Sequence, residues 1–208
     1  MPSNAHAAFA AQLGSVDQLI TIHEKMQRGR GRRHEQDALH RAGVVLIVAA
    51  WQSYVERVLG EALDIIGDNV TAAGAPLWGR QMYVLRRKQI DASIKKFNTP
   101  KDDNVRDLFL ESLGFNPWPH WGWVAGTRNW TSETTRTRTN DWVNVRHAIA
   151  HGFEFPNKDF LRGRYNLAPH LTLQLLKDCK KHFIYLVDKT DAAFGAHLVA
   201  ELGFAPWP

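Results

Sequence analysis

The sequence predicts an all-α fold, a bundle of about five or six helices. Apolar residues recur at helical spacing in several long segments, glycines and prolines separate these segments, and no run with strand-like alternation exceeds a few residues. The 208 residues contain no internal repeat, so we expect one domain over residues 1–208, with a core from about residue 15 to residue 190.

Composition and charge narrow the functional classes. Hydrophobic residues make up 44% of the chain and charged residues 23%, as in an ordinary globular protein. The net charge of +5 favours anionic partners, either nucleic acid or an acidic membrane surface. Cys179 is the single cysteine, so we expect no internal disulfide and no thiolate metal site. Residues 1–11 do not resemble a signal peptide, and the longest apolar run, residues 42–51, is about half a membrane span. We therefore expect a cytoplasmic protein without membrane contact.

The first expected helix covers residues 15–28 and ends at Gly29. A basic, glycine-broken loop follows at residues 28–34. It could lie along a phosphate backbone, although a solvated connector is the favoured interpretation because charge runs are usually solvated.

A long central helix is expected over residues 35–66, because residues 42–50 are apolar all round and an apolar stripe continues after Trp51. Glu56 and Glu61 fall within it. Either could be a catalytic carboxylate, but glutamates in such a helix usually face solvent or pair with arginine.

After a linker at residues 67–76, Tyr83, Ile90 and Ile94 mark the apolar face of another helix. The opposite face is basic. It could form an electrostatic track for nucleic acid, and a solubilising face is an equally good interpretation. Its cations are Arg86, Arg87, Lys88, Lys95 and Lys96.

The next helix should start with Thr99 as a hydroxyl cap and Pro100 in the first helical position, and end at Gly114. Residues 115–130 then form an irregular loop, because prolines and glycines exclude a long helix. The loop holds Trp118, Trp121, Trp123 and Trp130. These tryptophans could stack on unpaired bases, but we favour a structural role, since loop aromatics usually anchor the loop.

Residues 131–139, which are polar and rich in threonine and arginine, supply together with Asn140 and Asp141 the cap residues for a helix over about residues 140–151. After an irregular stretch, which includes Arg162 and Arg164, Pro169 precedes a last helix with Cys179 on its buried stripe. Cys179 is therefore interpreted as core filler.

Reactive side chains concentrate in the segment from Asn144 to Gly152, NVRHAIAHG. On an ideal helix Asn144, His147 and His151 share one face, whereas Arg146 lies about 140° from His151. Bringing Arg146 to His151 requires either that the helix ends before His151 or that a second copy of the motif lies across a subunit interface.

Three chemistries compete for this segment. His147 and His151 could ligate zinc, but Ala148 stands where a metalloprotease has its glutamate, and no third ligand is evident. A histidine could instead deprotonate a ribose 2′-hydroxyl while Arg146 binds the phosphate, which cleaves RNA without a metal. The third interpretation pairs Arg146 with an acid such as Glu56 and leaves the histidines to cap the helix. The residues alone do not rank the last two.

Arg146, a polar residue, three small or apolar ones and His151-Gly152 resemble the signature of the HEPN superfamily (higher eukaryotes and prokaryotes nucleotide-binding). The run RHAIAHG is similar to the RiboL-PSP-type branch, and so are WQSYVE at residues 51–56 and FNTPKDDNVRDLFLESLGF at residues 97–115. The resemblance spans roughly residues 39–186.

This resemblance implies an all-helical homodimer with both motifs at the interface, acting as a metal-independent endoribonuclease that leaves a 2′,3′-cyclic phosphate. It implies no cofactor, and a toxin, defence or RNA-processing setting in which an antitoxin or regulatory protein is a further partner. Arg146 and His151 become the catalytic pair. His147 would orient them or contact the phosphate.

We expect Asn144 and Glu56 to support the catalytic pair. RNA would bind the basic residues Arg86, Arg87, Lys88, Arg162 and Arg164. The alternative from another functional class is a non-catalytic HEPN module that binds RNA or a partner protein.

Overall fold

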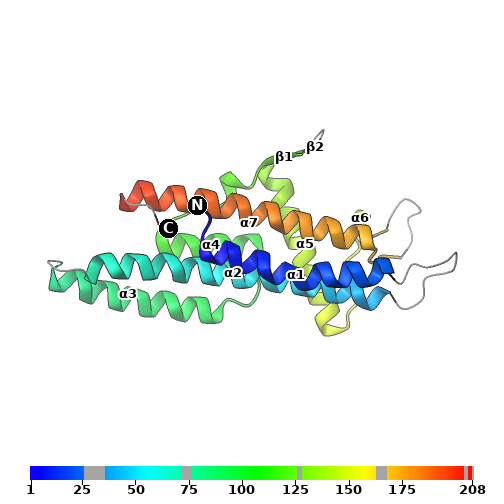
Figure 1. Ribbon diagram of the computed structural model, residues 1–208, viewed down its shortest axis with the longest axis horizontal. Coiled ribbons are helices and arrows are strands. Elements are labelled where there is room, and N and C mark those ends of the chain that lie inside the picture. Colours follow the sequence, from blue (N-terminus) through cyan, green and yellow to red (C-terminus); the bar gives the residue numbers. More distant parts are fainter. Residues whose placement is uncertain (26–35, 72–75, 126–127, 163–167, 204–205, 208) are drawn as a thin grey trace.

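The computed structural model describes residues 1–25, 36–71, 76–125, 128–162, 168–203 and 206–207. Within these ranges the chain is almost entirely helical, which confirms the predicted all-α class (Figure 1). The helices are α1 (Asn4–Lys25), α2 (Asp37–Thr71), α3 (Leu77–Lys96), α4 (Asp102–Leu113), α5 (Ser132–His151), α6 (Asp159–Arg162) and α7 (Leu173–Leu202). The basic loop predicted at residues 28–34 lies outside the described residues, as does Arg164.

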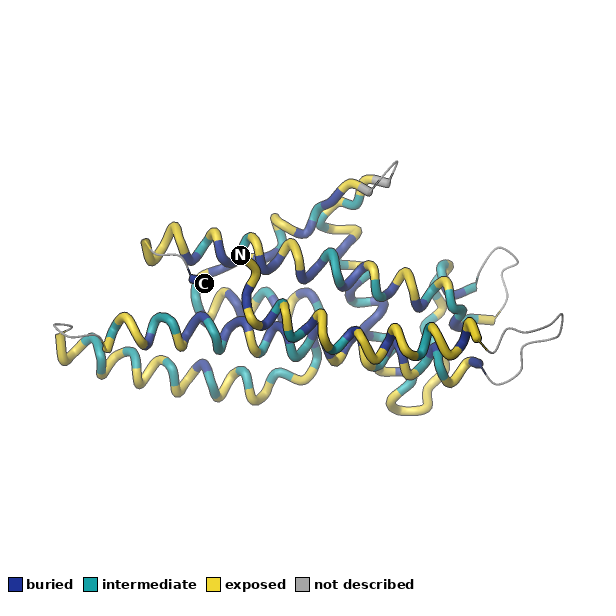
Figure 2. The backbone as a smooth tube through the Cα atoms, in the orientation of Figure 1, coloured by how far each residue is buried: buried dark blue, intermediate teal, exposed yellow. Residues whose placement is uncertain are grey.

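Helix α2 is the centre of the fold and packs against α1, α3, α5 and α7. Trp51 and Tyr54 are buried at its middle and stack with their ring centroids 5.7 Å apart. Figure 1 shows α1, α2 and α7 running along the long axis while α5 crosses them steeply. Buried residues gather where these helices face one another (Figure 2).

By length and composition alone α2 could also cross a membrane, since one window reaches a mean hydropathy of 1.3. That window is 56% buried inside the protein, and the core helix of a water-soluble protein passes the same test.

Helix α1 starts at Asn4, eleven residues before the expected start at residue 15. Ala5, Phe9 and Leu13 extend its buried stripe toward the N-terminus. The carboxylate of Glu61 accepts hydrogen bonds from the Asn4 and Ala5 amides, both at 3.0 Å, and so satisfies the first turn. Ser3 is a local cap as well, since its Oγ accepts a hydrogen bond from the His6 amide at 3.0 Å.

Helix α4 begins at Asp102, and the predicted cap by Thr99 is wrong. Lys101 occupies the cap position without a side-chain hydrogen bond. Instead the Asp102 amide donates to Asn140 Oδ1 at 3.0 Å, so a residue of α5 caps α4. Helix α4 ends as predicted at Gly114, which has a φ of 70°.

Helix α5 is eight residues longer than predicted, since it begins at Ser132. Thr131 Oγ1 accepts a hydrogen bond from the Thr134 amide at 3.1 Å and forms the N-cap. Asn140 and Asp141 therefore lie inside the helix. Helix α7 also runs further than expected, to Leu202, with Phe194 and Leu198 buried.

The tryptophan-rich segment folds into a short 3₁₀ turn, η1 (Trp118–His120), and a hairpin of β1 (Trp123–Ala125) and β2 (Arg128–Trp130). Trp121 is fully buried and donates to Thr190 Oγ1 at 2.9 Å. Trp123 is also buried and stacks against Trp130. The anchoring role predicted for these tryptophans is confirmed, although the segment is more regular than expected.

Candidate functional site

The motif occupies the last two turns of α5, which the core holds in place. Trp142, Val145 and Ala148 are buried on the face toward the bundle. Gly152 adopts the left-handed conformation, with φ 69° and ψ 23°, and the Phe153 amide donates to the Ala148 carbonyl at 2.9 Å. This pair of features is a Schellman-type ending, so the predicted helix end at Gly152 is confirmed.

Three exposed rings gather at this helix end. His147 and His151 lie one turn apart with ring centroids 4.3 Å apart. After the turn at Gly152 the ring of Phe153 lies 5.7 Å from that of His151, nearly parallel to it at 22°. Phe153 is itself 60% exposed. We call His147, His151 and Phe153 the motif cluster. It presents two imidazoles to solvent beside an apolar surface.

Arg146 lies on another side of the same helix. Its Nε is buried and has no hydrogen-bond partner in the described part of the chain, and no ion pair found there includes it. Because α5 continues through His151, the two residues stay about 140° apart around the helix axis. The first of the two predicted routes, a helix end before His151, is therefore wrong.

The two residues expected to support the catalytic pair, Asn144 and Glu56, lie in different parts of the fold. Asn144 is half-buried in α5, on the face it shares with His147 by helical spacing. Glu56 accepts a hydrogen bond from Gln52 at 2.9 Å, and Gln52 also donates to the Phe97 carbonyl at 3.0 Å. The contacts of the described residues thus place Glu56 near the end of α3, and none of them joins it to Arg146.

In the predicted basic track on α3, Arg86 and Arg87 bond to other parts of the fold, whereas Lys95 and Lys96 are exposed. Arg87 pairs with Asp64 at 2.8 Å and with Asp91 at 3.0 Å. Burial lowers the pKa of Arg87, but its hydrogen bonds, the first of them to Asp64, raise that pKa above its ordinary value. Arg86 donates to the Glu111 carbonyl of α4. Lys88 remains exposed.

Arg162 is half-buried at the end of α6, and Arg164 lies outside the described residues.

The zinc alternative lacks a ligand set in the described residues. Among them, no group of three or more histidines, cysteines, aspartates and glutamates has the geometry to hold a metal ion. His147 and His151 provide two donors, whereas a protein zinc site uses three or four.

Sequence reasoning missed a buried carboxylate that fixes α5. Asp102 accepts from Arg136 Nε at 2.7 Å and from Asn140 Nδ2 at 2.6 Å. Burial raises the pKa of Asp102, but the hydrogen bonds from Asn140 and Arg136 outweigh it and hold the pKa below its usual value. The carboxylate is ionised and ties α4 to α5. Its only signal in the sequence was its place in the first turn of a helix.

Two further buried groups, the Cys179 thiol and the His182 imidazole, keep their neutral forms. Burial raises the pKa of the Cys179 thiol well above its ordinary value, in keeping with its predicted place in the core. Burial, with the nearby charge of Arg138, lowers the pKa of His182 to about 3. His182 therefore stays neutral and bonds to Thr139 at 2.9 Å. Neither group can serve the motif cluster as an acid or nucleophile.

Comparison with known proteins adds one match. A family model described as RiboL-PSP-HEPN matches residues 14–196, which include most of α1, all of α2 to α6 and most of α7. Searches of curated proteins and of solved structures give no match.

Proposed function

Because the chain belongs to the RiboL-PSP-HEPN family, we propose that it is a metal-independent endoribonuclease in which His151 and Arg146 are the catalytic pair. The observation that carries this proposal is the end of α5. There, two solvent-exposed imidazoles 4.3 Å apart accompany an arginine whose Nε has no partner among the described residues. Such a set of groups suits a phosphate and the proton transfers around it.

In this reaction neutral His151 takes the proton of a ribose 2′-hydroxyl. The 2′ oxygen attacks the adjacent phosphorus, the bond from phosphorus to the 5′ oxygen breaks, and the 5′ oxygen takes a proton from solvent and leaves as a hydroxyl. His151 then returns its proton to solvent. The products are a 2′,3′-cyclic phosphate and a 5′-hydroxyl end. Arg146 donates a forked pair of hydrogen bonds to the phosphoryl oxygens as their charge grows.

His147 completes the site in this scheme. Its ring is in contact range of the His151 ring, so it can orient His151 or donate to the phosphate. Asn144 lies one turn earlier on the same face. Phe153 provides an apolar surface beside both rings.

The proposed enzyme is a homodimer. Arg146 and His151 point in different directions from one continuous helix, so a single α5 does not bring both to one phosphate. Two copies of α5 related by a two-fold axis can do so, because the arginine of one subunit then faces the histidine of the other. The two-fold axis would create two equivalent sites.

The cellular setting is proposed from the family resemblance: a cytoplasmic nuclease of a toxin or defence system, with an antitoxin as a regulatory partner. The net charge of +5 is in keeping with an RNA substrate. No cofactor enters the reaction.

A cleavage assay tests the proposal. The purified protein is incubated with mixed RNA in excess chelator, and the new ends are analysed. Wild type should yield 2′,3′-cyclic phosphate ends, and His151→Ala should reduce the rate by about 10²-fold or more, as expected for loss of a general base. His120→Ala, at an exposed histidine outside α5, is the matched control and should retain activity. Loss of cleavage on adding chelator would instead indicate a metal enzyme.

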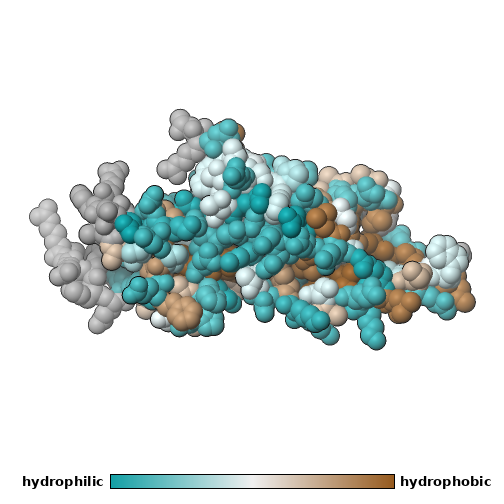
Figure 3. Space-filling view, turned by 180° about the vertical axis from the view of Figure 1, so that it is seen from behind, coloured by the Kyte–Doolittle hydropathy of each residue, from teal (hydrophilic) through white to brown (hydrophobic). Residues whose placement is uncertain are grey.

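A second candidate function is a non-catalytic HEPN module that binds a protein. It is favoured by an apolar surface at the end of the molecule where α2 meets α3, visible as brown areas in Figure 3. Its residues, each at least 60% exposed, are Leu77, Trp78, Met82, Val84 and Leu85. Exposed apolar patches of this kind often mark protein-binding sites. No RNA cleavage by folded wild type would favour this function, whereas unchanged cleavage by His151→Ala would contradict the role proposed for His151.

A further inference from the structure

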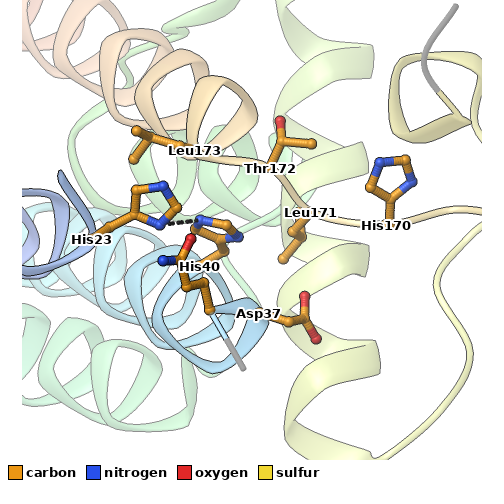
Figure 4. A pocket seen from close by; sticks show the side chains of 8 residues that line it. His23, Asp37, His40, His170, Leu171, Thr172 and Leu173 are labelled. Carbon is orange, nitrogen blue, oxygen red and sulfur yellow. Dashed lines mark hydrogen bonds between the residues drawn. The ribbon is translucent and has the colours of Figure 1, made fainter. Parts of the chain in front are cut away.

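A cavity of about 310 Å³ opens between the end of α1, the start of α2 and the segment that leads into α7 (Figure 4). His23 and His40 lie side by side in its wall, with His40 Nε2 and His23 Nδ1 3.1 Å apart. Both histidines are buried. Their ring centroids are 4.9 Å apart, so the two rings together form one aromatic side of the cavity.

The polar group that stands out in this cavity is the amide of Gln36. The residue is only 8% exposed, and its Oε1 is buried without a hydrogen-bond partner among the described residues. A buried acceptor without a partner is unfavourable, because the water it lost has not been replaced. A ligand that donates a hydrogen bond to Gln36 would remove this deficit.

The other polar edges of the cavity are also acceptors. His170 Nδ1 lies 3.0 Å from the Ala168 carbonyl, which can only accept, so Nδ1 carries the hydrogen and Nε2 of the neutral ring is an acceptor. Asp37 pairs with Arg41. Leu171 and Leu173 add apolar walls, as Figure 4 shows. The complementary ligand is flat, with apolar faces and N–H donors along its edge.

Arg41 joins the cavity to the segment that follows the motif cluster in the chain. The Arg41 guanidinium pairs with Asp37 at the cavity and lies over the ring of Phe155, with Cζ 4.8 Å from its centroid. Phe155 follows His151 by four residues and Phe153 by two. The Arg41 side chain is 43% exposed beside its partner Asp37, so a phosphate at this place can reach the remaining guanidinium N–H groups.

We propose that this cavity binds one unpaired nucleobase of the RNA substrate, with Gln36 Oε1 accepting a hydrogen bond from the exocyclic amino group of the base. Single-stranded RNA is commonly recognised through bases that leave the strand and enter pockets of this kind. The size of the cavity is at the lower end of ligand pockets, about 300 Å³, which suits a single base. Adenine, cytosine and guanine carry the amino group. Uracil offers only its N3–H, which lies between two carbonyl oxygens that would face the other acceptors of the cavity, so the site disfavours uracil. This inference rests on RNA being the substrate.

Nucleosides test the base preference without a phosphate. The full chain is titrated with cytidine and with uridine, and binding is followed through the ring signals of its histidines by NMR. Cytidine should bind at least fivefold more tightly than uridine. Gln36→Leu should remove that difference, while Gln36→Glu, which keeps acceptor oxygens, should preserve it. Gln174→Leu, at an exposed glutamine at the start of α7, is the control and should bind as wild type does. Thermal melting of each variant checks that it is folded.

Equal binding of the two nucleosides, or no binding of either at millimolar concentration, would overturn the inference. The same titration of His151→Ala separates the two proposals. If that variant still prefers cytidine but wild type does not cleave RNA, the pocket stands and the proposed nuclease fails. If wild type cleaves RNA without any nucleoside preference, the nuclease stands and the pocket fails.

Discussion

Asp102 and Asn140 are joined by two reciprocal hydrogen bonds. The Asp102 amide donates to Asn140 Oδ1 at 3.0 Å, and Asn140 Nδ2 donates to the Asp102 carboxylate at 2.6 Å. The pair caps α4 and fixes the middle of α5, about one turn before the motif. Arg136 adds an ion pair to the same carboxylate at 2.7 Å. The position of the motif helix therefore depends on a contact between residues 38 positions apart.

Removing this carboxylate should destabilise the protein. We expect Asp102→Ala to lower the free energy of unfolding by about 3 kcal/mol, because it leaves a partly buried arginine and an asparagine without their acceptor. Urea denaturation measures the change. Asp103→Ala, at the exposed neighbour, is the control and should cost well under half as much, about 1 kcal/mol or less. Equal losses in the two variants would show that the pair does not hold α4 to α5.

His182 should make stability depend on pH. Its folded pKa of about 3 lies below the ordinary value of 6.5. At a pH between these two values, His182 is protonated in the unfolded chain and neutral in the folded chain. Stability is therefore complete above pH 6.5 and falls as the pH drops toward 3, by about 2 kcal/mol at pH 5.

Urea denaturation at pH 7 and pH 5 tests this expectation in wild type and in His182→Gln, whose side chain does not titrate. The variant should lose about 2 kcal/mol less than wild type on acidification. His120→Gln, at an exposed histidine, should behave as wild type does. A variant as sensitive to acid as wild type would contradict the assignment to His182.

Two glycines of α2 should respond oppositely to alanine. A Cβ on Gly43 would lie 2.5 Å from Leu176 Cδ1 and 3.3 Å from its Cγ, and Leu176 is only 1% exposed. We expect Gly43→Ala to cost about 1–3 kcal/mol through overpacking between α2 and α7. A Cβ on Gly60 meets nothing within 4 Å, so Gly60→Ala should stabilise α2 by about 0.5–1 kcal/mol. Thermal melting distinguishes the signs.

The fold class was predictable because apolar spacing is a local signal. The stripe through Trp51, Val55 and Val58 identified the core helix, and Gly152 identified the end of the motif helix. Helix starts were harder, since some of their hydrogen-bond partners come from elsewhere in the chain. Glu61 caps α1 and Asn140 caps α4, and in both cases the partner lies more than 30 positions away.

The candidate site was also predictable only where its geometry depends on a single helix. Helical spacing correctly separated Arg146 from His151 and grouped His147 with His151, because both statements depend on one helix. The position of Phe153 beside the two histidines was not predicted, because it depends on how the chain turns at Gly152. The cavity at Gln36 could not be predicted, since the buried bond between His23 and His40 joins two helices.

A heterodimer of two inactive variants tests the shared site most directly. Arg146→Ala and His151→Ala are co-expressed with different affinity tags, and the mixed dimer is isolated and incubated with RNA in chelator. Each variant alone should be inactive. If the arginine of one subunit serves the histidine of the other, the mixed dimer keeps one intact site of two and should show about half of wild-type activity. A folded mixed dimer without activity, beside an active wild type, would contradict the shared site.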